Sequence, residues 1–414
     1  MITAANRSTT TMTVSEACDR LGVKAPTLYA YVSRGVLRRA RGSTARRTLL
    51  DAVEVERLAR RGRPRRSSRP FLFEVEIETS LTEIDDHRIR FRGHDAATLA
   101  RTVAFEQAAT LMWTGDLPAA IPAWRGPTFD TSAGHDLVDR LRLSVTLAAL
   151  ADPLRGDLEP AAVASCGASL IAAVVDSLPV VGDGRAPRLT LPGLTTPARG
   201  TVAGRLWART TAARPKPELV VALNAALVLL IDHELATSTF AARLAASTRA
   251  DPYAVVAAGL GPVSGPLHGG ASRVARDLLD DAHQRGAPAA LAEALRRDRR
   301  LPGFGHFLYP DGDPRAGVLL GLLREAARGT RTLDTVESVL EVVRQRTPVH
   351  PNVDFGLAAL TFVAGMPPET GELVFSTARV VGWLAHALEE YRATPLRFRP
   401  RARFVPAGPE PGRA

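Results

Sequence analysis

The chain has 414 residues, of which 45% are hydrophobic and 23% are charged, a composition that excludes a wholly disordered or collagen-like protein. Its length favours two or three folding units over one small domain. The formal net charge is +10, but residues 1–70 hold 16 Lys and Arg against 5 Asp and Glu, so the rest is nearly neutral. A basic first segment predicts a polyanionic partner, with nucleic acid favoured over a membrane surface.

The cysteines and the apolar stretches indicate the cellular compartment. Cys18 and Cys166 lie far apart, with no second thiol or histidine at metal-ligand spacing, so neither a disulfide framework nor a metal site is predicted. The first residues lack a basic segment followed by an apolar run, and the most apolar stretch, 219–231, contains Asn224. We expect a cytoplasmic protein without a membrane segment.

The N-terminal module, residues 1–62, is predicted to contain two short helices joined by a turn. Thr13 and Glu16 have the spacing of a capping box, so a helix should begin there and end near Arg20. A second helix should begin at Pro26, which fits a first helical turn, and end at Gly35. The polar and aromatic residues of this second helix are Thr27, Tyr29, Tyr31 and Ser33.

This pattern resembles the helix-turn-helix of MerR-type and excisionase-like families, with residues 46–51 and 52–61 as wing and third helix. In such modules the second helix enters the major groove and flanking arginines contact phosphates. The resemblance implies DNA binding through residues 1–70. The other reading is a helical appendage whose arginines are solvated, or which packs against the rest of the protein. Residues 63–71 have the composition of a flexible basic linker.

The remainder of the chain is predicted to be mostly α-helical. Ala, Leu, Arg and Glu recur at helical spacing between Pro and Gly breaks, for example over residues 96–113, 137–151, 161–175 and 217–231. Alternating residues at 72–78 and 88–92 predict a small sheet before the helices. The dinucleotide fingerprint, the Walker loop and the nucleophile elbow are all missing from the sequence, so these chemistries have no support.

Histidine, arginine and aspartate recur in short motifs at expected junctions between loops and helices. In chain order the motifs are Asp232-His233-Glu234-Leu235, Gly265-Pro266-Leu267-His268-Gly269-Gly270-Ala271, Pro302-Gly303-Phe304-Gly305-His306, Asp313-Pro314-Arg315, Pro351-Asn352-Val353-Asp354, Ala378-Arg379 and Arg399-Pro400-Arg401. Their order and spacing resemble the citrate synthase family over about residues 72–404. The Gly-Pro-Leu-His-Gly and Pro-Asn-Val-Asp motifs carry most of this resemblance.

The resemblance implies a mostly α fold with two helical domains after the N-terminal module. The large domain would comprise residues 72–268 and 360–405, the small domain residues 269–359, and residues 406–414 would form a flexible tail. Substrates would bind in the cleft between the two domains.

The resemblance also implies a role for each motif residue. Asp354 would be the general base for an acyl-CoA thioester, His268 would hold the enolate oxygen, and His306 would polarise the ketone of oxaloacetate. The residues implied to bind oxaloacetate are His233, Arg315, Arg379 and Arg399, and the residues implied to approach CoA are Gly269, Gly270 and Gly305. Arg399 would act across a subunit interface, which implies a homodimer or a higher oligomer. Acetyl-CoA would be a co-substrate, with no permanently bound cofactor.

Two positions depart from the bacterial pattern of the family. Ala236 stands where an asparagine is usual, and Phe307 stands where many members have arginine. Because Phe307 would alter the contacts with the acyl-CoA, a 2-methylcitrate synthase that uses propionyl-CoA is an alternative to a citrate synthase. A transcriptional regulator that senses a ligand with the same fold is a second alternative, favoured by the basic module and opposed by the general base.

Overall fold

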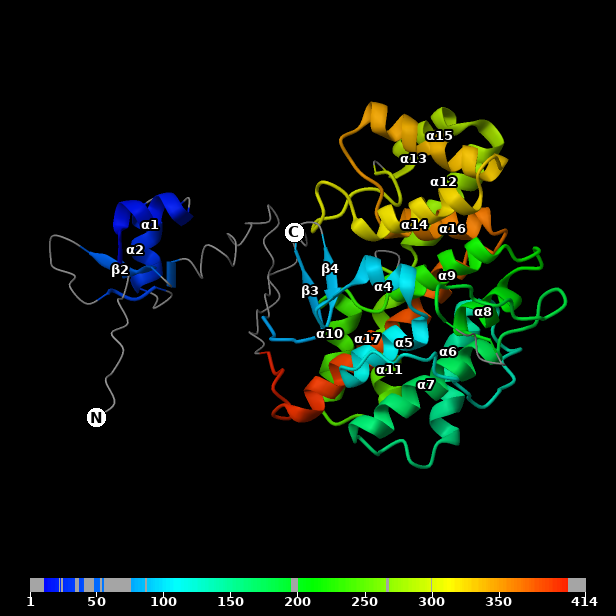
Figure 1. Ribbon diagram of the computed structural model, residues 1–414, viewed down its shortest axis with the longest axis horizontal. Helices are drawn as coiled ribbons and strands as arrows, with labels where there is room; N and C mark the ends of the chain where they lie inside the picture. Colours follow the sequence, from blue (N-terminus) through cyan, green and yellow to red (C-terminus); the bar gives the residue numbers. More distant parts are fainter. Residues whose placement is uncertain are drawn as a thin grey trace, which may run out of the picture. The chain divides into compact units, whose positions relative to one another are not determined.

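The computed structural model describes residues 11–21, 23, 25–33, 37–40, 48–52, 54–55, 76–85, 88–194, 200–265, 268–298 and 300–400. The chain divides into two compact units, Met1–Ile77 and Glu78–Ala414 (Figure 1). The predicted linker and the predicted tail lie outside the described residues. The division of the second unit into a large and a small domain stays a prediction.

The first unit has the predicted helix-turn-helix. It contains β1 (Thr11–Thr13), α1 (Val14–Leu21), α2 (Ala25–Ser33) and β2 (Leu49–Asp51), with β1 antiparallel to β2. The capping box is present, because the Thr13 amide donates to Glu16 at 2.8 Å and the Glu16 amide donates back to Thr13 at 3.3 Å. The core of this unit consists of Ala17, Leu28, Leu37, Leu50 and Val55. Gly35 and most of the predicted third helix lie outside the described residues.

A small antiparallel sheet opens the second unit. Its strands are β3 (Thr82–Ile84), β4 (Ile89–Phe91) and β5 (His94–Asp95), in the order β3-β4-β5. The strand predicted at residues 88–92 is therefore confirmed. Residues 76–78 are not in a strand, and residues 72–75 lie outside the described part of the chain.

Helices form the rest of the second unit. Their bounds are α4 (Ala96–Thr102), α5 (Phe105–Thr114), α6 (Leu137–Ala151), α7 (Pro160–Asp176), α8 (Val202–Thr210), α9 (Pro217–Leu229), α10 (Thr237–Ser247), α11 (Pro252–Val263), α12 (Ala271–Arg285), α13 (Ala287–Asp298), α14 (Pro314–Ala326), α15 (Arg331–Arg346), α16 (Val353–Val363) and α17 (Thr370–Arg392). The helices predicted at 137–151, 161–175 and 217–231 are confirmed as α6, α7 and α9. The mostly helical fold is confirmed as well.

The prediction of one helix over residues 96–113 is wrong in one respect, because the helix is broken at residues 103–104, between α4 and α5. The cause is Asn224 of α9, which is fully buried. Its side-chain oxygen accepts a hydrogen bond from the backbone amide of Phe105, and its side-chain nitrogen donates one to the backbone carbonyl of Val103, both at 2.9 Å. A tertiary contact therefore satisfies the backbone groups freed at the break. No local Pro or Gly marks the break in the sequence.

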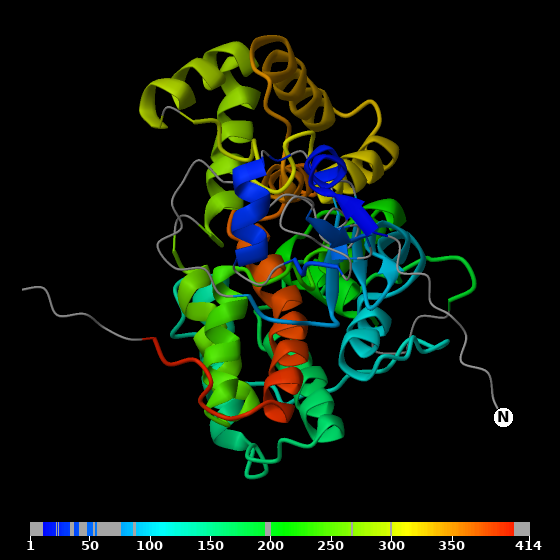
Figure 2. The same cartoon turned by 90° about the vertical axis from the view of Figure 1, so that its left-hand side faces the viewer.

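Helix α17 is the central element of the second unit. It packs against α5, α6, α7, α9, α10, α11, α12 and α16, and both views show it running through the body (Figures 1 and 2). A Cβ at Gly382 of α17 would lie 2.3 Å from the Ile231 carbonyl oxygen, so only glycine permits this close approach. The approach holds the segment after α9 against α17. None of the helices described is both long enough and apolar enough to cross a membrane.

Replacing Asn224 with alanine should destabilise the second unit. The substitution leaves one buried amide and one buried carbonyl without a partner, which costs about 2 to 4 kcal/mol of the free energy of unfolding. Urea denaturation followed by circular dichroism measures this loss. The matched control is Thr102→Ala, an exposed hydroxyl at the end of α4, which should change stability by less than about 0.5 kcal/mol. Equal stability of the two variants would contradict the role of Asn224.

Candidate active site

The predicted site residues lie at the ends of helices or on α17. Their positions are the connection from α9 to α10 for His233, the turn before α12 for His268, the loop before α14 for His306, the first turn of α14 for Arg315, the first turn of α16 for Asp354 and the middle of α17 for Arg379. Electrostatic interactions link these residues, since the charge of Arg315 lowers the pKa values of His233 and His306 and opposes the rise in the pKa of Asp354. Arg379 in turn acts on His233 and His268. The structure therefore brings six of the predicted residues into one neighbourhood.

Two helix caps hold the loop of His306 and the first turns of α14 and α16 together. The buried carboxylate of Asp313 caps α14 and accepts hydrogen bonds from the Arg315 amide, Nε and Nη2 at 2.9 to 3.0 Å. It also accepts from the Val353 amide at the start of α16 at 3.0 Å. Asn352 caps α16 and donates from its side chain to the Gly305 carbonyl at 3.0 Å. One carboxylate and one amide thus fix three segments relative to one another.

Tyr309 joins two of the histidines. Its hydroxyl lies 2.8 Å from Nε2 of His233, and its ring stacks on His306 with the centroids 4.9 Å apart. Nδ1 of His306 accepts a hydrogen bond from the Leu308 amide at 3.2 Å. A neutral His306 therefore carries its proton on Nε2, the nitrogen left for a ligand. The sequence motifs did not identify Tyr309, whose hydrogen-bond partner His233 is 76 residues away in the chain.

Burial keeps the histidines neutral. It lowers the pKa of His306 to about 4, with Arg315 adding to the effect, and lowers the pKa of His268 to about 4, with help from Arg379. The pKa of His233 also falls well below its usual range, because of burial first and then of the two arginines. For His268, burial is the larger cause and Arg379 the smaller one.

A buried hydroxyl orients His268. Oγ of Ser238, at the start of α10, lies 2.8 Å from Nε2 of His268, and the ring of Phe375 contacts the imidazole edge to face at 5.5 Å. If Ser238 donates, Nε2 is the acceptor and Nδ1 carries the only proton of the ring. The helix that contains Ser238 is capped by Ala236, which forms no side-chain capping bond. The amide expected at this position of the family is therefore missing here.

Asp354 has the properties of a general base. Burial raises the pKa of its carboxyl to about 6; Arg315 opposes this rise and Asp313 adds to it. Within the described residues, the carboxylate accepts no hydrogen bond, although the Asp354 amide donates to Asn352 at 3.0 Å. A carboxylate that is little stabilised by donors is a stronger base than one at the surface.

The two buried arginines differ in their partners. The charge of Arg315 is compensated by the Asp313 carboxylate, which accepts hydrogen bonds from Nε and Nη2. Arg379 is only 1% exposed, lies over the Phe375 ring at 4.7 Å, and has its Nη1 4.0 Å from Asp232. Its Nε and Nη1 have no acceptor among the described residues, and burial lowers its pKa to about 10. A buried guanidinium with unpaired donors is suited to an anionic ligand.

Arg399 is not part of this neighbourhood within one chain. It is exposed in the segment that follows α17. No hydrogen bond or ion pair between described residues joins it to the six residues above. Its predicted role across a subunit interface stays a prediction.

The predicted glycines differ in what the backbone requires of them. Gly305 adopts a φ of +79°, which favours glycine, and its amide donates to the His350 carbonyl at 2.8 Å. A Cβ at Gly269 would lie 2.3 Å from Cγ1 of Val263, so packing of the turn before α12 requires glycine there. Gly270 is the cap residue of α12. Their approach to CoA stays a prediction.

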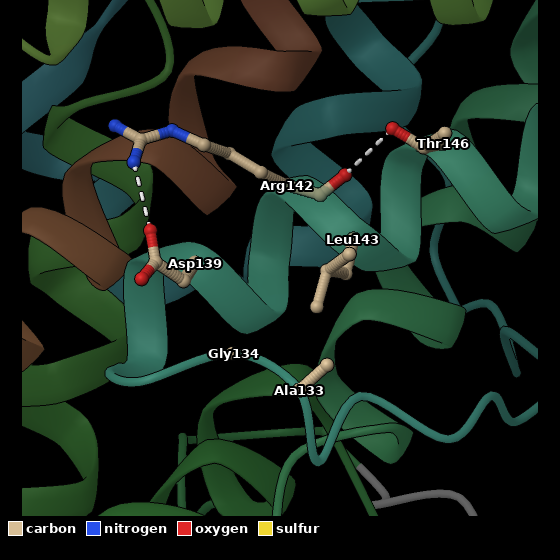
Figure 3. A pocket seen from close by; sticks show the side chains of 6 residues that line it. All are labelled: Ala133, Gly134, Asp139, Arg142, Leu143 and Thr146. Carbon is tan, nitrogen blue, oxygen red and sulfur yellow. Dashed lines mark hydrogen bonds and ion pairs between the residues drawn. The ribbon is translucent and has the colours of Figure 1, made fainter.

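A hollow beside α6 is separate from these residues. It has a volume of about 280 Å³ and is lined by Ala133, Gly134, Asp139, Arg142, Leu143 and Thr146 (Figure 3). Arg142 and Asp139 lie one turn apart on α6, with Nη1 of Arg142 3.2 Å from Oδ1 of Asp139. None of the predicted site residues lines this hollow.

Comparison with known proteins gives matches for both units. Residues 74–401 match the family described as citrate synthase, C-terminal domain, and residues 11–63 match a helix-turn-helix domain. The 2-methylcitrate synthase 1 of Corynebacterium glutamicum is 28% identical over 349 residues, 77% of this chain and 90% of that protein. Citrate synthase 2 of Bacillus subtilis is 29% identical over 357 residues, 81% of this chain and 94% of that protein.

Solved structures show the same fold. A ternary complex of citrate synthase from Thermoplasma acidophilum with carboxymethyl coenzyme A and oxaloacetate has a TM-score of 0.63 at 23% identity. The match covers 81% of this chain and 95% of that chain. The citrate synthase of Pyrobaculum aerophilum has a TM-score of 0.55 at 25% identity, over 80% and 91% of the two chains.

Replacing Asp313 with alanine should destabilise the second unit strongly. The substitution leaves the buried guanidinium of Arg315 uncompensated and removes the cap of α14, at a cost of about 3 to 5 kcal/mol in the free energy of unfolding. Asp313→Asn keeps one acceptor for the Arg315 amide and should cost less. Thermal and urea unfolding of both variants measure the difference. A stable Asp313→Ala protein would contradict the proposed function of this cap.

Proposed function

The chain belongs to the citrate synthase family, and we propose that it condenses acetyl-CoA with oxaloacetate and water to give citrate and CoA. The observation that carries this proposal is Asp354, a partly buried carboxylate with a raised pKa, in the same neighbourhood as two neutral histidines. This combination suits removal of a proton from carbon at neutral pH. The enzyme would be an acyltransferase whose acyl group becomes an alkyl group on transfer.

The first step forms the nucleophile. The Asp354 carboxylate takes a proton from the methyl group of the thioester, and the electron pair moves to the thioester oxygen. Nδ1–H of His268 donates a hydrogen bond to that oxygen, while Ser238 holds Nε2 as an acceptor at 2.8 Å. Because the pKa of His268 is low, its imidazole stays neutral and stabilises the enolate by a hydrogen bond, without carrying a permanent charge.

The second step forms the carbon–carbon bond. The methylene carbon attacks the ketone carbon of oxaloacetate, and the ketone oxygen receives a proton from Nε2–H of His306. The Leu308 amide fixes this tautomer from the other side of the ring. Water then cleaves the thioester of the citryl-CoA so formed, releasing citrate and free CoA thiol.

The substrate carboxylates need cations. Arg379 offers two nitrogen atoms without other acceptors, and Arg315 offers the Nη1 that Asp313 does not use. His233, held by Tyr309, would be a neutral donor to the same substrate. Arg399 would complete the set from a second subunit of a homodimer or higher oligomer. Acetyl-CoA would be bound as a co-substrate near Gly269, Gly270 and Gly305.

Propionyl-CoA is the alternative acyl substrate, giving 2-methylcitrate. Phe307 supports this alternative, because its ring is 80% exposed and stacks on His306 with the centroids 5.0 Å apart. It gives an apolar surface beside the residue that polarises the ketone. One additional methylene changes binding by only about 1 to 3 kcal/mol, so both thioesters belong in the same assay.

The proposed reaction is tested by release of CoA thiol from acetyl-CoA or propionyl-CoA, with and without oxaloacetate. Replacing Asp354 with asparagine should reduce kcat by about 100-fold to 10,000-fold, because the base is lost. Asp334→Asn, an exposed carboxylate of α15, is the matched control and should have the activity of the unmodified protein. If neither thioester releases thiol, the proposed reaction is wrong, and a ligand-sensing regulator becomes the leading hypothesis.

The pH dependence of this activity follows from Asp354. Its carboxyl has a raised pKa of about 6 and acts only when deprotonated. Activity is therefore complete well above pH 6, and kcat/KM for the acyl-CoA should fall about tenfold per pH unit below it. His268 and His306 stay neutral down to about pH 4 and do not contribute to this limb. A flat profile between pH 7 and pH 5 would exclude Asp354 as the base.

For the first unit we propose DNA binding. The match to a helix-turn-helix domain and the excess of positive charge over residues 1–70 favour it. Leu28 of α2 is buried in the core of the unit, whereas Thr27 and Tyr29 of the same helix are exposed. An exposed polar and aromatic helix face next to arginines is suited to a groove and its phosphates.

DNA binding is tested by fluorescence anisotropy with duplex DNA at several salt concentrations. The full chain should bind with an affinity that falls steeply with salt, since counterions are released. Replacing Arg38 and Arg39 with glutamine should reduce the slope of log Kd against log salt by up to about 2. The matched control replaces Arg328 and Arg331, exposed in the second unit, and should leave the slope unchanged. Binding that is absent, or equally weak in both variants, would exclude this function.

A further inference from the structure

A series of polar side chains, all buried except the last, extends from Arg379 to the segment after α17. Its members, called the polar chain here, are Thr82, Asp232, His386, Arg243, Glu390 and Arg397. Asp232, His386 and Glu390 are completely buried, and Arg243 is 1% exposed. The mechanism above uses none of them directly. Burying so many polar and charged groups is costly unless they are paired and hydrogen-bonded with one another.

The contacts of His386 define its tautomer. Nη1 of Arg243 lies 2.6 Å from Nδ1 of His386, and a guanidinium can only donate. Nδ1 is therefore an acceptor, and a neutral ring carries its proton on Nε2. That nitrogen lies 3.2 Å from Oδ2 of Asp232. His386 is thus a donor to the carboxylate of Asp232.

This donor fixes the carboxylate that faces Arg379. Oδ2 of Asp232 accepts from both His386 and the Thr82 hydroxyl, the latter at 2.5 Å. Oδ1 has no hydrogen-bond partner among the described residues and lies 4.0 Å from Nη1 of Arg379. Because two donors hold Oδ2, the position of Oδ1 is also fixed. The electrostatic attraction between Asp232 and the guanidinium of Arg379 is therefore fixed as well.

The other end of the polar chain keeps His386 in this tautomer. Arg243 is paired with Glu390 at 2.6 Å and with Glu389 at 2.8 Å. Glu390 also accepts from Arg397 of the segment after α17 at 2.9 Å. Together with Arg379 and Asp232, three guanidinium groups face three carboxylates.

We propose that His386 is a positioning residue for substrate binding, which acts through Asp232 to orient Arg379 toward a carboxylate of oxaloacetate. The proposal rests on the proposed function for the identity of this ligand. Asp232 joins the two side chains, since it contacts His386 through Oδ2 and faces Arg379 with Oδ1.

Two substitutions of His386 separate this role from a general structural one. His386→Gln places an amide nitrogen where Nε2 stood and keeps the donor to Asp232. His386→Asn places its amide near Nδ1, so it keeps a contact with Arg243 but does not reach Asp232. Both variants leave a polar group in the same buried space.

The expected result is a selective change in one Michaelis constant. His386→Asn should raise KM for oxaloacetate by about tenfold or more, with KM for acetyl-CoA changed less than about twofold. His386→Gln should restore KM for oxaloacetate to within about threefold of the unmodified protein. Thr82→Val removes the second donor to Oδ2 and should raise the same constant by a smaller factor.

Several outcomes would overturn the proposal. These are an unchanged KM for oxaloacetate in both His386→Asn and Thr82→Val, equal effects of His386→Asn and His386→Gln, or parallel changes in the constants of both substrates. If His386→Asn does not fold, the Thr82→Val result decides. If the unmodified protein releases no CoA, the proposed reaction fails separately. Isothermal titration calorimetry with oxaloacetate then tests the same variants through Kd.

Discussion

The site depends most on the carboxylate of Asp313. It caps α14, neutralises the buried guanidinium of Arg315 and accepts the first amide of α16, which carries Asp354. Because α14 and α16 pack against each other, this one group sets the relative position of a substrate arginine and the proposed base. The charge of Arg315 also moderates the raised pKa of Asp354. Without Asp313, a lone buried cation would remain next to the base.

Features that depend on local sequence were predictable. Thr13 and Glu16 formed the predicted capping box, and the helical spacing of apolar residues located α6, α7 and α9. Apart from Arg399, the motif histidines, arginines and aspartate each lie near a helix end or on the central helix. Such positions follow from caps, glycines and periodicity over a few residues.

Features that depend on distant contacts were not predictable from local pattern. Asn224 breaks the first long helix by binding a backbone 119 to 121 residues away. Tyr309, Ser238 and His386 gain their significance only from the ring or carboxylate that the fold brings next to them. A lone tyrosine, serine or histidine inside a helical pattern gives no signal of such a partner. The same limit applies to the low pKa of His268, which comes from burial and from Arg379, 111 residues away in the chain.

The central claim is that Asp354, His268 and His306 act together on a thioester and a ketone held by Arg315 and Arg379. The most direct measurement is a crystal structure with oxaloacetate and an unreactive analogue of acetyl-CoA. The account predicts the ketone oxygen on Nε2 of His306, a substrate carboxylate on the guanidinium of Arg379, and the Asp354 carboxylate facing the analogue's reactive carbon. Oxaloacetate bound away from Arg379, or an analogue that does not approach Asp354, would contradict it.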